Sequence, residues 1–442
     1  MQVKTKYKQT ELGLIPDDWE FKKIAELIED GSILGHLDGN HGELYPRSHE
    51  FKEYGIPYIG ATDFHNGSVD FSECKHLSLE RAKQFKKGIA KCGDVLFAHN
   101  ATVGPVALLI TQLEFVILST TATYFRCNHL KVDNIFLKYA LQSQVFVTQY
   151  RAVMAQSTRF QVPITAQRKL ALTLPTLPEQ RAIATALSDV DALITSLDRL
   201  IAKKQDIKQA TMQQLFTGKT RLPGFKKKDG FKQTEIGLIP EDWEVKTLKD
   251  LHFDISDGNY SSKYPKASDF VSFGVPFIRA NNIKNLRITD EDMRCISLSQ
   301  HGELLKGHLK ENDVLITTRG DIGNVAIVPC THIGSNINAQ IVRINTTDQK
   351  VNHLYFAFYL SCSKTQEWIR GAQSGSALKQ LPVGRLVRMP VILPLVAEQH
   401  AIATVLSDMD TELSTLEQRR NKTNLLKQGM MQELLTGRTR LV

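Results

Sequence analysis

The chain has 442 residues, of which 42% are hydrophobic, and it carries a net charge of +8 at pH 7 with a pI near 9.0. This length exceeds a single hydrophobic core, which rarely passes about 250–300 residues, and the moderate positive charge allows a polyanionic partner without establishing one. The six cysteines form no C-x-x-C pair, no apolar signal core opens the chain, and no run approaches the roughly 20 apolar residues of a membrane span, so we expect a soluble cytoplasmic protein.

The chain opens with the box "GLIPDDWEFK", in which a Pro-acid pair and a Glu-x-Lys superficially resemble the PD…(D/E)xK pattern of metal-dependent nucleases. In such a site the carboxylates converge on one metal from neighbouring strands. Here Trp19 lies between Asp18 and Glu20 in one short turn, which excludes that convergence. We expect the apolar residues of the box to pack the entry of this half onto a later long helix, with a proline fixing the turn: Leu14, Ile15, Pro16 and Trp19.

About 150 residues of short mixed segments follow the box. Strand-like runs are separated by Gly and Asn/Asp turns, and they include "GIPYIGA", "DVLFAHN", "VALLI" and "FVILSTTATYF". This region is therefore predicted to be a mixed α/β domain.

A long helix is predicted from Glu179 to Phe216, where it would run about 57 Å at roughly 1.5 Å per residue, with Gly218 at its stop. Its apolar residues recur at alternating spacings of four and three, a heptad stripe that a second long helix repeats near the end of the chain. Such a stripe is also typical of a core-facing helix, but no third helix of similar length is available to cover the two stripes, so we predict that they pack on each other. The pairing residues are Ile183, Leu187, Val190, Ile194, Leu197 and Ile201 in the first helix and Ile402, Leu406, Met409, Leu413 and Leu416 in the second.

The sequence contains an internal repeat. "DGNHGELYP" at Asp38 returns at Asp257 and "EQRAIATALSDVD" at Glu179 returns at Glu398, a constant offset of 219 positions. The opening box returns 224 positions later as "GLIPEDWEVK", so the second half lacks five residues soon after it. Residues 222–234, rich in Gly and Lys, are predicted to be a solvated connector between two homologous halves.

Catalytic signatures are missing from the sequence. "GKT" at Gly218 lacks the glycine-rich cradle of a phosphate loop, and no N-P-P-[YF], G-x-S-x-G or H-E-x-x-H segment occurs. The thirteen histidines form no ligand cluster. We therefore predict no catalytic residue, no metal site and no cofactor bound by this chain.

The two halves share turn glycines, prolines and apolar residues, and they differ in polar residues of the same four loop regions. These regions follow Asp38, Ile59 and Ala98 in the first half, and the fourth is "QSTRFQ". Most of the differing residues can bond base edges or phosphates. Drift of surface loops explains part of this divergence, but the pattern favours two readers with different targets on one scaffold.

The repeated "G-L-I-P-x-D-W-E" box, the "G-[IV]-P-[YF]-I" strand, the "DVL…G" segment and the "EQ-x-A-I-A-x-x-L-S-D-x-D" helix start together resemble the DNA-specificity subunit of type I restriction–modification systems. The resemblance covers nearly the whole chain. It implies two mixed α/β target recognition domains, an antiparallel pair of long helices with pseudo-twofold symmetry, and recognition of a split, asymmetric DNA sequence without catalysis by this chain. It also implies double-stranded DNA, two methyltransferase subunits carrying S-adenosylmethionine, and translocating restriction subunits as partners, and no membrane.

By this resemblance the four loop regions of each half face DNA. The predicted DNA-binding residues are Asn40, His41, Arg47, Thr62, Asp63, His99, Asn100, Thr102, Gln156, Ser157, Thr158 and Arg159 in the first half and Asn259, Tyr260, Lys263, Lys266, Arg279, Asn281, Asn282, Arg319, Asp321, Ser376, Lys379 and Gln380 in the second. The second half carries the familiar "TRGDIGN" form of the third loop, whereas Asn100 and Ala101 stand in place of Arg319 and Gly320 in the first.

The predicted domains are a first recognition domain (residues 1–178), a first long helix (179–218), a connector with the second box (219–242), a second recognition domain (243–397), a second long helix (398–436) and a tail (437–442). Two other classes of function stay open on the sequence. One is a nuclease or methylase acting alone, which would need a metal or cofactor motif. The other is a coiled-coil adaptor with duplicated protein-binding domains, which would show no DNA sequence preference.

Overall fold

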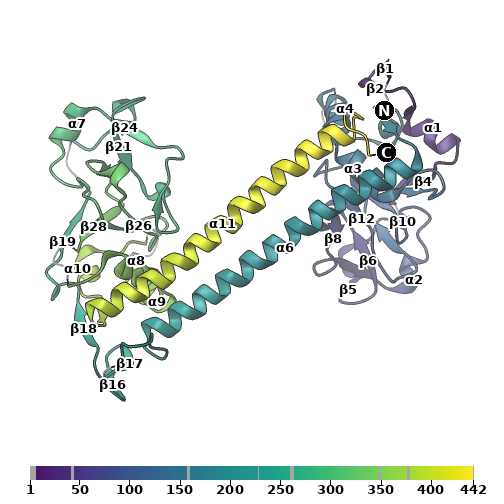
Figure 1. Ribbon diagram of the computed structural model, residues 1–442. Helices are drawn as coiled ribbons and strands as arrows, with labels where there is room; N and C mark the ends of the chain where they lie inside the picture. The colour runs from purple at the N-terminus through teal and green to yellow at the C-terminus, as the bar shows by residue number, and fades with distance from the viewer. Residues whose placement is uncertain are drawn as a thin grey trace. The chain divides into compact units, whose positions relative to one another are not determined.

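A computed structural model describes residues 6–40, 44–156, 160–226, 228–258, 263–346, 350–375 and 379–441 (Figure 1). The chain divides into two compact units. Unit 1 comprises Met1–Asp198 and Gln418–Val442, and unit 2 comprises Arg199–Glu417. Each unit therefore holds one mixed α/β region and parts of both long helices.

Unit 1 contains two main sheets, with strand orders β4-β14-β11-β12-β8-β7 and β10-β13-β6-β9-β5, and two small pairs, β1-β2 and β3-β15. The strands are β1 (Tyr7–Thr10), β2 (Gly13–Pro16), β3 (Glu20–Lys23), β4 (Ile33–Asp38), β5 (Phe51–Lys52), β6 (Ile56–Ile59), β7 (Phe64–His65), β8 (Ser68–Val69), β9 (Lys75–Leu77), β10 (Ile89–Ala90), β11 (Val95–Ala98), β12 (Val106–Leu108), β13 (Val116–Leu118), β14 (Ala122–Cys127) and β15 (Ala171–Leu174). The short helices are α1 (Ile24–Glu29), α2 (Leu79–Ala82), α3 (Asn134–Gln142), α4 (Gln144–Ala155) and α5 (Ile164–Gln167).

The core of unit 1 lies on both faces of β11, whose four residues are all buried. Successive side chains of a strand point to opposite faces. Phe97 accordingly packs on one face against the rings of Phe146 and Tyr150 from α4, at 5.9 and 5.7 Å between ring centroids. Leu96 joins a separate apolar cluster on the other face. The fully apolar run "VLFA" therefore forms a central strand because it can bury both of its faces.

Unit 2 has the equivalent two main sheets with fewer strands, in the orders β19-β28-β25-β26 and β20-β24-β21-β27, and the pairs β16-β17, β18-β29 and β22-β23. Its strands are β16 (Phe231–Thr234), β17 (Gly237–Pro240), β18 (Glu244–Thr247), β19 (Asp254–Asp257), β20 (Phe270–Val271), β21 (Val275–Ile278), β22 (Ile283–Lys284), β23 (Arg287–Ile288), β24 (Arg294–Ile296), β25 (Val314–Thr317), β26 (Val325–Ile327), β27 (Asn336–Ile337), β28 (Ile341–Asn345) and β29 (Pro390–Leu393). Its short helices are α7 (Leu298–Glu303), α8 (His353–Ser361), α9 (Ser363–Gly371) and α10 (Val383–Leu386). The duplication read from the sequence is thus a duplication of strand order.

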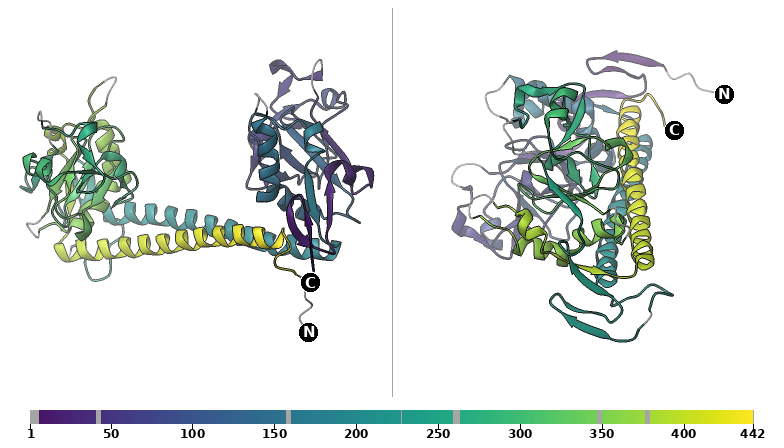
Figure 2. Two further views of the ribbon diagram at one scale, coloured as in Figure 1. Left: turned by 90° about the horizontal axis from the view of Figure 1, so that it is seen from above. Right: turned by 90° about the vertical axis from the view of Figure 1, so that its left-hand side faces the viewer.

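The two long helices are α6 (Leu177–Phe216) and α11 (Val396–Leu434), of 40 and 39 residues. In unit 1, Asp191 and Asp198 of α6 pair with Lys427 and Arg420 of α11 at 2.7 and 3.2 Å. In unit 2, Lys204 pairs with Glu412 at 2.7 Å, and Lys208 pairs with Asp410. Within each unit the partner's number falls along α11 as the number rises along α6, so the helix segments run antiparallel, side by side in the ribbon views (Figures 1 and 2). The predicted fold class, mixed α/β units with long antiparallel helices, is confirmed.

The heptad stripes have two different environments. Their first turns pack into the α/β cores, with Ile183 and Leu187 in the core of unit 1 and Ile402 and Leu406 in that of unit 2. Farther along, Leu197, Ile201 and Leu413 are buried, whereas Val190, Ile194, Met409 and Leu416 are half-buried. The start of each stripe is therefore a core-facing helix face, and the remainder lies in the segments that carry the ion pairs between α6 and α11.

A clasp holds the opening box on the start of α6. Trp19 is fully buried, and its Nε1 donates to Glu179 Oε2 at 3.0 Å. Arg440, from the tail after α11, donates to both oxygens of Glu179 at 2.5 and 2.8 Å and to both oxygens of Asp18 at 2.9 and 2.7 Å. The predicted packing of Trp19 on the long helix is confirmed.

The clasp occurs a second time in unit 2. Arg221, from the tail after α6, donates to both oxygens of Glu398 and of Asp242, while Trp243 Nε1 donates to Glu398 Oε2 at 3.0 Å. In both units the arginine that follows one helix therefore binds the first turn of the other helix.

The expectation for Leu14 is wrong. Its side chain is 62% exposed and that of its counterpart Leu238 is 59% exposed, while Ile15 and Ile239 are buried. Neighbouring residues of a strand point to opposite sides, so only one of the two can face the helix. The connector also contains more structure than predicted, because residues 231–234 form β16 and pair with β17.

Candidate nucleic-acid interface

In unit 1 the loops that follow β4, β6 and β11 converge on the turn between β13 and β14, Ser119–Thr121. Ser119 N donates to Ile59 O at 2.7 Å, at the end of β6. His99 N, just after β11, donates to Thr121 O at 2.9 Å. A Cβ added to Gly39, after β4, would lie only 2.4 Å from the backbone of Ser119, so this approach requires glycine. Three loops distant in sequence thus meet at one place.

Unit 2 builds the same convergence on Asn338–Gln340, the turn between β27 and β28. Asn338 N donates to Ile278 O at 2.9 Å, and Thr318 N donates to Gln340 O at 2.7 Å. Gly258, after β19, lies against Asn338, because an added Cβ would come within 2.3 Å of its carbonyl oxygen. Three of the four loop regions predicted to read DNA therefore meet in each unit.

The fourth loop region lies beside the third in both units. Asn100 forms an isolated antiparallel bridge with Gln161, and Arg319 forms the equivalent bridge with Gln380. Phe160, next to the first bridge, is 80% exposed. All four predicted regions consequently form one candidate interface in each unit.

Predicted contact residues of unit 1 divide into exposed and inward-facing groups. Arg47, Thr62, Thr102 and Gln156 are exposed, and Asn100 is half-buried. Asn40 and His99 are only 5% exposed. The Asn40 amide donates to Lys87 O, and Asp63 Oδ2 accepts from Gly60 N at 2.7 Å. The structure thus places Asn40, His99 and Asp63 as groups that hold the loops.

In unit 2, Lys263, Lys266, Asn281, Asp321 and Lys379 are exposed, whereas Arg319 and Gln380 are half-buried. Asn282 is fully buried, and its amide donates to Thr289 O and Glu291 O, so it holds its own loop. Arg279 donates to Asp292 Oδ2 at 2.8 Å, and this hydrogen bond lowers the pKa of Asp292. Asp292 therefore occupies one nitrogen of the Arg279 guanidinium, for which a nucleic acid would compete.

Seven predicted contact residues lie outside the described part of the chain: His41, Ser157, Thr158, Arg159, Asn259, Tyr260 and Ser376.

Sequence reasoning missed two features of the interface. The run "FVILSTTATYF" reads as one strand, but Ser119–Thr121 divide it into β13 and β14 and form the turn on which the loops meet. The signal was present in the polar residues at equivalent positions, "STT" in one half and "NAQ" in the other. The second missed feature is Lys87 and its equivalent Lys306, which are exposed and adjoin the loops after β4 and β19.

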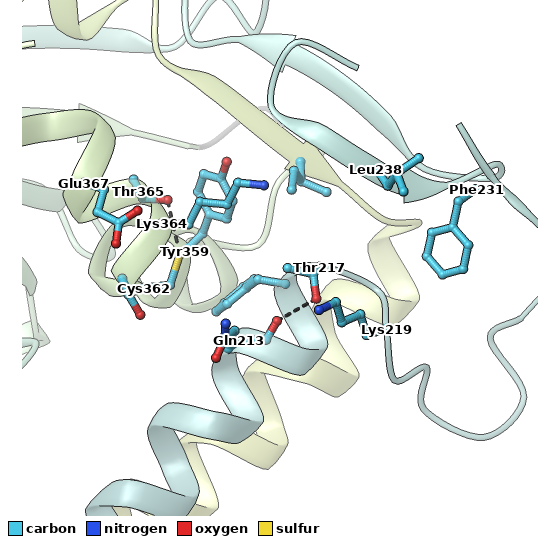
Figure 3. Close-up of a pocket in the computed structure, with 13 residues that line it drawn as sticks. Gln213, Thr217, Lys219, Phe231, Leu238, Tyr359, Cys362, Lys364, Thr365 and Glu367 are labelled. Carbon is cyan, nitrogen blue, oxygen red and sulfur yellow. Dashed lines mark hydrogen bonds between the residues drawn. The ribbon is translucent and has the colours of Figure 1, made fainter. Parts of the chain in front are cut away.

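A second duplicated feature is an apolar cleft beneath each opening hairpin. In unit 2 it measures about 640 Å³ and is lined by the end of α6, the β16–β17 hairpin and the α8–α9 turn. Figure 3 shows Phe231 and Leu238 of the hairpin opposite Tyr359 and Lys364. The cleft of unit 1 measures about 470 Å³ and shares part of this lining, with Tyr7, Leu14 and Leu435 in place of Phe231, Leu238 and Phe216. Its basic residue Arg438 corresponds to Lys219.

Within the described residues, no group of three or more His, Cys, Asp or Glu side chains is arranged to hold a metal ion. No helix in the described part of the chain has the length and apolarity needed to cross a membrane.

A family model described as the type I restriction modification DNA specificity domain matches this chain twice, at residues 16–209 and 240–426. The type I restriction enzyme MjaVIII specificity subunit of Methanocaldococcus jannaschii is 26% identical over 437 residues, covering 97% of this chain and 94% of that protein. The EcoBI specificity subunit of Escherichia coli is 27% identical over 278 residues, covering 60% of this chain and 58% of that protein.

Two solved structures share the fold. One, described as the basis of complex assembly and conformational transition of the type I R-M system, aligns with a TM-score of 0.58 at 18% identity over 96% of this chain and 99% of that chain. The S subunit of a type I restriction-modification system from M. genitalium aligns with a TM-score of 0.55 at 15% identity over 98% and 99%.

Proposed function

Since this chain belongs to the type I restriction–modification DNA-specificity family, we propose that each unit reads one part of a split DNA target through its four converging loops. The role of DNA specificity subunit follows from the family. The assignment of the reading to these loops is the further step. The observation that carries it is the duplicated convergence, because two equivalent backbone arrangements present different polar side chains.

The chemistry of the exposed side chains supports DNA as the ligand. Unit 2 presents Lys263, Lys266, Lys306 and Lys379 around its converging loops, and such cations bind phosphates. Asn281 in unit 2 and Thr62, Thr102 and Gln156 in unit 1 are exposed neutral groups, which can donate to and accept from base edges. The inward groups Asn40, Asp63 and Asn282 hold the backbone that carries these contacts.

We propose that two copies of a methyltransferase subunit dock on this chain, one on each cleft. The duplicated part of the lining supports this stoichiometry, because apolar residues of the hairpin and helix end and one basic residue recur in both clefts while the reading loops differ. The methyltransferase would carry S-adenosylmethionine and modify adenine N6 in the cytoplasm. This chain would supply recognition and no catalysis, and restriction subunits would complete the nuclease.

Methylome sequencing of cells that express the methyltransferase with and without this chain tests the proposal. The expected result is a bipartite motif with methylated adenine that disappears without the chain. Variants at exposed loop residues, Thr102→Ala in unit 1 and Asn281→Ala in unit 2, should each relax one part of the motif and leave the other part unchanged. A motif that is continuous, or that persists without the chain, would reject the proposal in favour of an adaptor role.

A further inference from the structure

A buried chain of polar side chains lies beneath the candidate interface of unit 1. It links His36 on β4, Gln167 on α5, Thr123 on β14 and His99 after β11. These four residues are 3%, 0%, 0% and 5% exposed. Buried polar groups cost free energy unless they are hydrogen-bonded, so four of them in one row need a reason.

The hydrogen bonds along this row of four buried side chains run in one direction. The Val162 carbonyl can only accept, so the group 2.8 Å from it is the Gln167 amide nitrogen, and Gln167 Oε1 faces His36 Nε2 at 3.1 Å. The same nitrogen donates to Thr123 Oγ1 at 3.1 Å. The Thr123 hydroxyl proton is then free to donate to His99 Nδ1 at 2.8 Å. This order places the proton of a neutral His99 ring on Nε2.

His36, the first of the four buried side chains, is neutral. Burial lowers its pKa to about 4, and its Nδ1 has no partner within the described residues, as suits an unprotonated nitrogen. Its Nε2 therefore carries the proton that Gln167 Oε1 accepts.

The row of buried side chains ends, at His99, beside two of the four loops that form the candidate interface. His99 N donates to Thr121 O at 2.9 Å, and His99 O accepts from Val162 N at 2.8 Å. The Asn100–Gln161 bridge follows directly. A fixed His99 ring consequently fixes the start of the third loop and the end of the fourth, next to Thr102 and Phe160.

Unit 2 contains the same backbone without the polar chain. Leu381 N donates to Thr318 O at 2.9 Å and Thr318 N to Gln340 O at 2.7 Å, which reproduces the contacts of Val162 and His99. The positions of His36, Thr123 and Gln167 are occupied there by Ile255, Val342 and Leu386, which pack in the core. The same backbone therefore forms with apolar residues at these three positions. It follows that folding does not require the buried polar side chains of unit 1.

We infer that His36, Thr123 and Gln167 are positioning residues for DNA recognition by unit 1, and that they act by fixing the orientation and tautomer of His99. The inference rests on the proposed role of the loops in reading DNA. It assigns to three buried residues a part in the specificity of one half of the target only, because unit 2 has no counterpart to them.

The test uses the complete chain in complex with its methyltransferase subunits and three duplexes: the target, the target changed in the part read by unit 1, and the target changed in the part read by unit 2. Thr123→Val removes the hydroxyl at almost constant volume, and Thr123→Ser retains it. The triple variant His36→Ile, Thr123→Val, Gln167→Leu copies the residues of unit 2. Affinities are measured by fluorescence anisotropy.

For Thr123→Val and the triple variant, discrimination against the first changed duplex should fall roughly tenfold, in the range of one well-placed base contact, with discrimination against the second unchanged. Thr123→Ser should behave as the unmodified chain. Unchanged discrimination in Thr123→Val, or equal loss in both parts of the target, would overturn the inference, because the buried polar residues lie in unit 1 alone.

Asn100→Ala and Thr102→Ala separate this inference from the proposed function. If they leave recognition of the first part intact, the loops do not read DNA and the proposed function fails. If they weaken it while Thr123→Val does not, the positioning role alone fails.

Discussion

Arg440→Ala should lower the free energy of unfolding of unit 1 by an amount that follows from the geometry of the clasp. The Glu179 side chain is 0% exposed and that of Arg440 is 15% exposed, so the substitution leaves a buried carboxylate without its cation. Removal of one partner of a buried ion pair costs about 3–5 kcal/mol. The hydrogen bonds that Arg440 donates to Glu179, followed by those to Asp18, raise the pKa of Arg440, in line with strong pairing. Glu179 would retain the Trp19 indole N–H, which places the expected loss near the lower end, at about 3 kcal/mol.

The assay is urea unfolding followed by circular dichroism, with hydrogen exchange to assign the loss to unit 1. Arg438→Ala is the matched control, because this arginine is two residues away with a side chain that is 59% exposed and 3.8 Å from Glu433. It should cost less than about 0.5 kcal/mol. Glu179→Gln added to Arg440→Ala should recover part of the loss, since the unpaired charge is gone. A cost for Arg440→Ala equal to that of Arg438→Ala would refute the reasoning.

Three further predictions concern other features. Burial lowers the pKa of His36 to about 4, against about 6.5 in an unfolded chain, so the unfolded state binds more protons between these pH values. The free energy of unfolding of unit 1 should therefore fall by up to about 3 kcal/mol as the pH falls from 6.5 to 4. Unfolding measured as a function of pH should show a smaller fall in His36→Ile, and an equal pH dependence in the variant and the unmodified protein would contradict the prediction. Leu238 and Leu14 are exposed residues of the two clefts, so Leu238→Asp and Leu14→Asp should each abolish binding of one of the two methyltransferase copies in sedimentation analysis. Leu130 is 84% exposed and lies outside the clefts, so Leu130→Asp should retain both copies. Deletion of seven residues from each long helix at matching positions, 199–205 and 413–419, removes about 10 Å from each helix and should shorten the spacer of the methylated motif by about three base pairs; an unchanged spacer would show that the helices do not set it.

The sequence allowed the repeat, the long helices and the four loop regions to be predicted, because all three depend on patterns along the chain. A constant offset identifies equivalent residues, and heptad spacing identifies a helix face. The side on which a residue points in a two-stranded hairpin depends on packing with a distant element, which is why Ile15 is buried and Leu14 is not. For the same reason Asn40 and His99 were expected at the surface although their partners, Lys87 and Thr123, draw them inward.

The clasps also depend on contacts that no local pattern shows. Arg440 and Glu179 are 261 positions apart, and the motif "TGRTRL" gives no indication of a partner. An arginine recurs at Arg221, but its role becomes visible only in the geometry of Asp242 and Glu398.

The order of synthesis makes the two units unequal. Unit 2 is one uninterrupted stretch, so a ribosome releases all of its residues before the chain is finished. Unit 1 needs Leu434, Leu435 and Arg440, which follow every residue of unit 2 along the chain. The unit whose first residues are synthesised earlier therefore completes its core only after all of unit 2 has been made, and loss of residues 434–440 would leave unit 2 whole and unit 1 without its clasp.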